Sequence, residues 1–166
     1  LVEPNKGNRD WSTLADLEAS LLRTSQKGIE TILIVRSTPT WAQTISGATC
    51  GPIKSEELVT FGLFLYDAVM RYSQPPYNVK YWEIWNEPDM PMFFTGTPKK
   101  MVELVKEAYT ILKEVDPENK IISPPVTGYI IMIGWLNEFL RQGGKDYIDI
   151  IGTHYYVWLK TDLPEN

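Results

Sequence analysis

The stretch YWEIWNEPD, residues 81–89, decides how this chain can be built. Its first part is rich in aromatic and β-branched residues, which favour a β-strand. The strand must end at Pro88, because proline has no backbone N–H to donate to a sheet. We therefore predict a strand over residues 79–85 that presents Glu87 at its carboxyl end, with Asn86 beside it as a two-way hydrogen-bonding group.

Outward from this strand, helical and extended patterns alternate along the chain. The run Ile32–Val35 is apolar at every position, as in parallel strands that helices cover. Helix signals include Ser55 as a cap and the pair Thr97-Pro98 as an N-cap and first turn. The order αβαβαβαβ predicts an α/β fold with a parallel sheet and crossover helices. A first helix, with its apolar stripe over residues 14–22, is expected to be opened by Asp10 or Ser12 and closed by Gly28. Further helices are expected over residues 55–74, 98–115 and 135–140, and strands over 29–35, 79–85, 121–123 and 148–152.

Three motifs together resemble the clan A glycoside hydrolases. In that clan a barrel strand ends in Asn-Glu-Pro, as residues 86–88 do here. Gly28–Trp41 resembles the preceding strand and its loop in the family-39-like and cellulase-like members. Tyr147–Tyr156 resembles the sixth strand, with its His-x-Tyr ending. The motifs occur in the family's order and cover nearly the whole chain, which makes a chance match of one motif a poor explanation.

The resemblance implies an incomplete barrel. A whole (β/α)8 TIM barrel typically takes about 250 residues, and this chain has 166. We therefore expect a single partial catalytic domain over residues 1–166, with about four βα units that correspond to the third to sixth barrel strands. The open sheet edges are expected to meet either the remainder of a longer parent chain or a second copy in a homo-oligomer.

The implied activity is hydrolysis of O-glycosidic bonds in a β-linked oligo- or polysaccharide, with retention. By resemblance Glu87 is the general acid/base. The aromatic surroundings from Trp82 and Trp85 are expected to raise its pKa by disfavouring the charged form.

The nucleophile is expected to be missing from this chain. A retaining enzyme needs a second carboxylate about 5 to 5.5 Å from the first. In the resembled families it is a Glu at the end of the seventh strand, which the match does not reach. The other candidates here match no nucleophile motif: Asp89, Glu138 and Asp149.

Five residues are expected to bind the substrate. By resemblance, Asn86 bonds the sugar 2-hydroxyl, and the His-x-Tyr pair His154 and Tyr156 contacts the sugar or the catalytic carboxylates. Trp41 and Trp158 are either flat platforms for sugar rings or aromatic residues at the edge of the core.

One buried ion pair is also expected. Glu83 shares a strand face with Glu87, so it should point into the barrel, where an unpaired carboxylate is costly. Arg36, at the end of the neighbouring strand, is its predicted structural partner.

Composition excludes several classes of partner. The net charge of −5 and the pI of about 4.9 argue against nucleic acid and anionic membranes. No stretch approaches the roughly 20 apolar residues of a membrane span. One cysteine and one histidine cannot assemble a zinc site. We therefore predict no metal and no cofactor, and we leave the compartment open because Leu1 is not an initiator Met.

Two other interpretations stay open at this point. A noncatalytic carbohydrate-binding or scaffold domain would keep the cleft without the second carboxylate. A flavodoxin-like nucleotide-binding or flavin-binding domain fits the alternation and the length, but no strand is followed by a Gly-rich phosphate loop.

Overall fold

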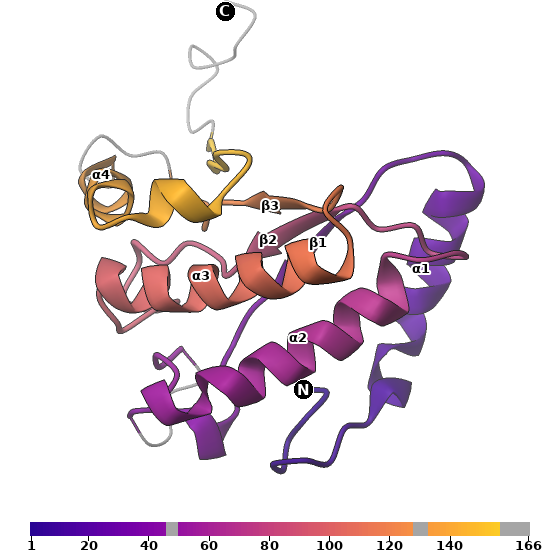
Figure 1. Ribbon diagram of the computed structural model, residues 1–166, viewed down its shortest axis with the longest axis horizontal. Helices are drawn as coiled ribbons and strands as arrows, with labels where there is room; N and C mark the ends of the chain where they lie inside the picture. Colours follow the sequence, from indigo (N-terminus) through magenta and orange to yellow (C-terminus); the bar gives the residue numbers. More distant parts are fainter. Residues whose placement is uncertain (46–49, 128–132, 157–166) are drawn as a thin grey trace, which may run out of the picture.

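The computed structural model describes residues 1–45, 50–127 and 133–156 of the chain. Figure 1 shows its helices and strands alternating along the sequence, as the pattern predicted. The α-helices and strands are α1 (Ala15–Gln26), β1 (Ile32–Val35), α2 (Leu58–Tyr72), β2 (Tyr81–Ile84), α3 (Pro98–Val115), β3 (Lys120–Ile122) and α4 (Ile133–Arg141). Short 3-10 helices are η1 (Trp11–Leu14), η2 (Thr40–Ala42), η3 (Ser55–Glu57) and η4 (Gly144–Tyr147).

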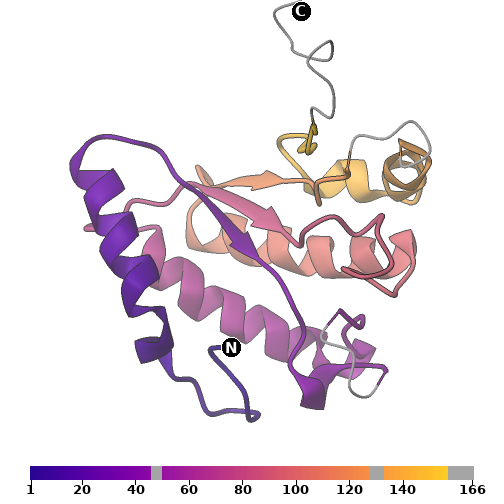
Figure 2. The ribbon, with the colours of Figure 1, turned by 180° about the vertical axis from the view of Figure 1, so that it is seen from behind.

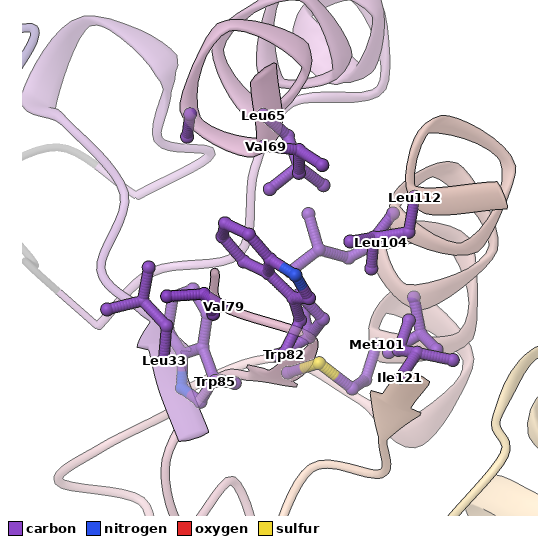
Figure 3. Packing of buried hydrophobic residues seen from close by; sticks show 14 of the residues in the cluster. Leu33, Leu65, Val69, Val79, Trp82, Trp85, Met101, Leu104, Leu112 and Ile121 are labelled. Carbon is purple, nitrogen blue, oxygen red and sulfur yellow. The ribbon is translucent and has the colours of Figure 1, made fainter. Parts of the chain in front are cut away.

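The three strands form a parallel sheet in the order β1-β2-β3. The register aligns Leu33, Trp82 and Ile121 across the sheet, and all three side chains are buried. Figure 3 shows the Trp82 indole between side chains of α2, such as Leu65, and side chains of α3, such as Leu104. This layer of helices over one sheet face forms the hydrophobic core.

The other sheet face is open along β1, whereas Glu83 of β2 and Ile122 of β3 are buried on it. Ile32 and Ile34, which alternate with the core residues of β1, are 53% and 44% exposed. In Figures 1 and 2, α2 and α3 run along the same side of the sheet. In a closed barrel the strands' inner side chains fill the interior, so exposure of this face is what a partial barrel would show.

Helix ends follow the predicted chemistry in one case and depart from it in another. The Thr97 hydroxyl accepts the Lys100 backbone N–H at 3.4 Å, and Pro98 is the first residue of α3, which confirms the predicted start. The prediction that Ser55 caps a helix is wrong. Ser55 lies within η3, and its hydroxyl accepts a hydrogen bond from Lys100 Nζ at 2.9 Å. This bond links η3 to α3.

The prediction of a last strand over residues 148–152 is wrong. In the described part of the chain this segment runs beside β3 without a regular ladder. Among the described residues, 148–153 form two isolated parallel bridges, which join Ile122 to Ile150 and Val126 to Thr153. The described sheet therefore has three strands, where four were predicted.

Side chains explain the missing ladder. The Asp149 carboxylate accepts the Ile121 backbone N–H at 2.9 Å, and the Ser123 hydroxyl accepts the Gly152 backbone N–H at 3.0 Å. Backbone groups that bond to side chains are not available for regular strand pairing. Asp149 is held in turn by Lys113 at 2.9 Å, so it is a framework residue, as the sequence indicated.

Candidate functional site

Residues with strained, positive φ angles lie just beyond the carboxyl ends of β1 and β2. Ser37 has φ 72°, Trp85 has φ 75° and Glu87 has φ 45°, values that residues other than glycine rarely adopt. A turn follows Glu87, because its carbonyl accepts the Met90 backbone N–H at 3.0 Å. Strained residues of this kind cluster at functional sites, so this edge of the sheet is the candidate site.

Glu87 lies at the centre of the site. Its side chain is almost wholly buried, with the residue 5% exposed. One carboxylate oxygen, Oε1, lies 2.8 Å from Nδ1 of His154 and also accepts the hydroxyl of Tyr156. His154 is fixed by its own backbone, whose N–H donates to the Val126 carbonyl at 2.8 Å. His154 and Tyr156 therefore contact the Glu87 carboxylate, which is one of the two kinds of contact that the resemblance implied for them.

The predicted direction of the Glu87 pKa shift is wrong. Burial raises the pKa of Glu87, but the hydrogen bonds from Tyr156 and His154 lower it further than burial raises it, so the net pKa lies below the ordinary value. The expected aromatic environment also differs in detail. Trp82 points into the core, and the Trp85 indole N–H donates to the Phe93 carbonyl at 2.8 Å.

Glu83 lies in β2, four residues before Glu87, and lacks its predicted partner. In the described residues it forms no ion pair with Arg36. Glu83 is aligned with Ile34 in the register, whereas Arg36 lies beyond the end of β1 and is exposed. Burial therefore raises the pKa of Glu83, and the charge of His154 opposes this shift only in part.

Asn86 lines a polar hollow of about 250 Å³ at the ends of β1 and β2. Glu87 is not among the described residues that line it, although Asn86 directly precedes Glu87 in the chain. Its lining consists of Arg36, Ser37, Cys50, Trp85, Asn86, Met92 and Phe93.

Trp41 faces a different hollow. That larger space, of about 350 Å³, lies between the N-terminal segment, β1 and α2. The Trp41 indole N–H donates to the Glu3 carbonyl at 3.2 Å, and the Lys6 ammonium lies 5.7 Å from the ring centroid. The structure therefore does not bring Trp41 together with Asn86. Trp158 lies outside the described residues.

Sequence reasoning missed one buried pair beside Glu87. Asp89, 8% exposed, accepts the Thr127 backbone N–H at 3.1 Å and the Thr127 hydroxyl at 2.6 Å, both at Oδ2. Asp89 follows the Asn-Glu-Pro motif directly, which was the available signal. No pattern in the sequence pointed to Thr127.

The described residues offer neither a cluster of metal ligands nor a helix that could span a membrane. They contain no group of three or more His, Cys, Asp or Glu side chains placed to hold a metal ion. Within the same residues, no helix has the length and apolar character needed to cross a membrane.

Comparison with known proteins places the chain in a family. Residues 65–164 match the family described as "Glycosyl hydrolase catalytic core". A curated β-xylosidase from Caldicellulosiruptor saccharolyticus is 34% identical over 96 residues, which cover 57% of this chain.

Two solved structures show the same fold. A GH39 β-xylosidase from Caulobacter crescentus is similar with a TM-score of 0.65 and 25% identity over 92% of this chain. The catalytic domain of GH30 xylanase C from Talaromyces cellulolyticus is similar with a TM-score of 0.74 and 15% identity over 93% of it. This confirms the predicted α/β barrel segment, with three described strands in place of four.

The match covers a minor part of each relative. The chain spans 19% of the curated β-xylosidase, 36% of the GH39 structure and 41% of the GH30 structure. The family match nevertheless covers more than half of this chain, including Glu87 and the His-x-Tyr segment. The chain belongs to the glycosyl hydrolase catalytic core family.

Proposed function

We propose that this chain carries the acid/base part of a retaining glycoside hydrolase site, with Glu87 as the general acid/base. The observation that supports this most is the arrangement of Glu87 itself. A buried carboxylate at a strained strand end receives hydrogen bonds from both His154 and Tyr156 on one oxygen. We assign to the second oxygen the role of meeting a glycosidic oxygen or a water molecule.

Glu87 would act twice in one catalytic cycle. It first protonates the leaving-group oxygen and later removes a proton from the water that releases the sugar. A second carboxylate about 5 to 5.5 Å away would raise the pKa of Glu87 while it is charged. Once that carboxylate is bonded to the sugar its charge is gone. The lowered pKa that Glu87 has in this chain then suits the base step.

The second carboxylate, the nucleophile, would come from residues outside this chain. Asp149 is bound to Lys113, and Glu138 is paired with Arg141, so both have framework roles. The open sheet face, with Ile32 exposed, is consistent with further strands covering it in a longer parent chain or in a homo-oligomer. Residues 1–166 would then form one partial catalytic domain.

The proposed substrate is a β-linked oligo- or polysaccharide that contains xylose. Two relatives are named β-xylosidases and one is named a xylanase. Asn86 would bond the sugar 2-hydroxyl from the polar hollow that it lines. We propose Trp41 and Trp158 as aromatic platforms on which sugar rings stack. Because Trp41 lines the other hollow, it would contact a sugar unit farther from Glu87.

The test uses Glu87→Gln in a full polypeptide that contains this chain. We expect kcat/KM to fall by about 10²- to 10⁴-fold on xylosides with poor leaving groups, because these need protonation. Substrates with good leaving groups, such as dinitrophenyl xyloside, should lose far less in the glycosylation step. Glu114→Gln, at an exposed position of α3, is the matched control.

Two results would contradict the proposal. Full activity of Glu87→Gln on the natural substrate would remove Glu87 from the acid/base role. A wild-type polypeptide that binds xylo-oligosaccharides and hydrolyses none of them would favour the alternative, a noncatalytic carbohydrate-binding domain.

A further inference from the structure

The contact between Asp89 and Thr127 joins the carboxyl ends of two neighbouring strands. Asp89 lies two residues beyond Glu87, after β2, and Thr127 lies after β3. Both residues are buried, and one carboxylate oxygen of Asp89 accepts both the backbone N–H and the hydroxyl of Thr127. The distance between the two strand ends is therefore set by side-chain bonds beyond the sheet itself.

The same contact belongs to a closed ring that begins and ends at Glu87. Asp89 holds Thr127, and the residue before Thr127, Val126, accepts the backbone N–H of His154 at 2.8 Å. His154 in turn places Nδ1 at 2.8 Å from the Glu87 carboxylate. A shift of the Thr127 segment would therefore move His154 relative to Glu87.

Burying Asp89 at this position costs folding free energy. Its second carboxylate oxygen, Oδ1, is buried and has no hydrogen-bond partner among the described residues. A buried polar atom without a partner costs free energy. Asp89 is therefore better explained by what it positions than by its own contribution to stability.

We propose that Asp89 and Thr127 are positioning residues, whose contact keeps His154 Nδ1 on the carboxylate of Glu87. The structural part of this inference stands on the ring of contacts alone. Its catalytic consequence rests on the proposed acid/base role of Glu87. Neither residue touches the reacting atoms; both act through the place that they give to His154.

The chain offers a direct probe, because His154 is its one histidine. In the ¹⁵N-labelled chain, the imidazole nitrogens of His154 give a single pair of signals that report which nitrogen carries the proton in the neutral ring. While Nδ1 donates to Glu87, the Nδ1–H tautomer should predominate. We expect Thr127→Val, which removes the hydroxyl and keeps the shape, to shift the neutral ring towards the Nε2–H tautomer by tenfold or more. Thr127→Ser, which keeps the hydroxyl, should match the wild type.

A second pair of variants guards against misfolding. Asp89→Ala removes the acceptor, whereas Asp89→Asn keeps one acceptor oxygen for Thr127. We expect Asp89→Ala to behave as Thr127→Val and Asp89→Asn to behave as the wild type. If both Thr127→Val and Asp89→Ala unfold while their conservative partners fold, the contact holds the fold rather than the site, and the proposal is overturned.

Kinetics in the full polypeptide separate this inference from the proposed function. For poor leaving groups we expect Thr127→Val to lower kcat by about 10- to 100-fold with KM nearly unchanged, since the catalytic pair is misplaced and binding is not. An unchanged tautomer and an unchanged kcat in a folded Thr127→Val would overturn the inference even if Glu87→Gln behaves as an acid/base variant should. A changed tautomer in a protein with no glycosidase activity would sustain the inference and refute the proposed function.

Discussion

Adding one methyl group at Gly152 tests how closely the segment before His154 must lie on β3. A Cβ atom there would lie 2.9 Å from Cγ2 of Ile122, 3.2 Å from the Ser123 carbonyl oxygen and 3.3 Å from Oε2 of Glu83. Non-bonded carbon atoms prefer separations of about 3.5 to 4.0 Å. The Ser123 carbonyl belongs to the backbone and cannot rotate away, so the segment itself must move outward.

The cost of Gly152→Ala is steric, because the backbone of Gly152 does not adopt a positive φ. Overpacking by a methyl group costs about 1–3 kcal/mol in a tight site. The movement also strains the hydrogen bond from the Gly152 N–H to the Ser123 hydroxyl, which is 3.0 Å long. We therefore expect the free energy of unfolding to fall by about 1–3 kcal/mol, and the Tm by about 2–4 °C for each kcal/mol. His154, two residues later, should lose contact with Glu87.

Urea unfolding followed by tryptophan fluorescence measures this change. Gly134→Ala is the matched control, because a Cβ at Gly134 in α4 meets no atom within 4 Å and alanine favours a helix by up to about 1 kcal/mol. Gly134→Ala should therefore be neutral or stabilising. If Gly152→Ala is as stable as the wild type, the segment is not packed against β3 as described.

Substitutions at three further residues test the charges and the core. Tyr156→Phe should raise the pKa of Glu87, because one hydrogen bond fewer then opposes the effect of burial. In the wild type, ionised Glu87 stabilises the fold above its ordinary pKa of 4.5, and this stabilisation is lost as the pH falls through the lower pKa of the folded state. The stabilisation should be smaller in the variant. An unchanged acid limb of stability against pH would contradict that. Glu83→Gln should raise the Tm at pH 7, because burial raises the pKa of Glu83 and its ionised form therefore opposes folding. The gain in Tm should vanish below the ordinary pKa of 4.5, where the carboxyl group is neutral in both states. An equal gain at pH 3 would point to packing instead. Trp82→Ala should cost about 3–5 kcal/mol by urea unfolding. Trp82→Phe should cost distinctly less, because the buried indole N–H has no hydrogen-bond partner among the described residues; equal costs would show that the N–H is satisfied after all.

The sequence predicted the parts of the fold that local patterns determine. The apolar run of β1 and the aromatic and β-branched run of β2 indicated strands, and the Thr97-Pro98 pair indicated where α3 begins. The ordered motifs also led to the meeting of Glu87 with His154, because parallel strands present their carboxyl ends at one edge.

Other features could not be predicted, since they depend on contacts between distant segments. The segment over residues 148–152 has the composition of a strand, but Asp149 and the Ser123 hydroxyl take backbone partners that a ladder would need. The pKa of Glu87 depends on two donors more than 60 residues away in the chain, and composition could give only the effect of burial. The bond from Asp89 to Thr127 left no periodic signal at all.

Azide rescue of Glu87→Ala is the most direct test of the central claim. In a full polypeptide that contains this chain, the variant should form the glycosyl-enzyme from an activated aryl β-xyloside and then stall, because no base activates water. Azide needs no base. We predict that it restores turnover and yields a β-xylosyl azide, with the anomeric configuration of the substrate retained, as ¹H NMR would show. No rescue by azide, or an α-xylosyl azide, would contradict the assignment of Glu87 as the acid/base of a retaining glycoside hydrolase.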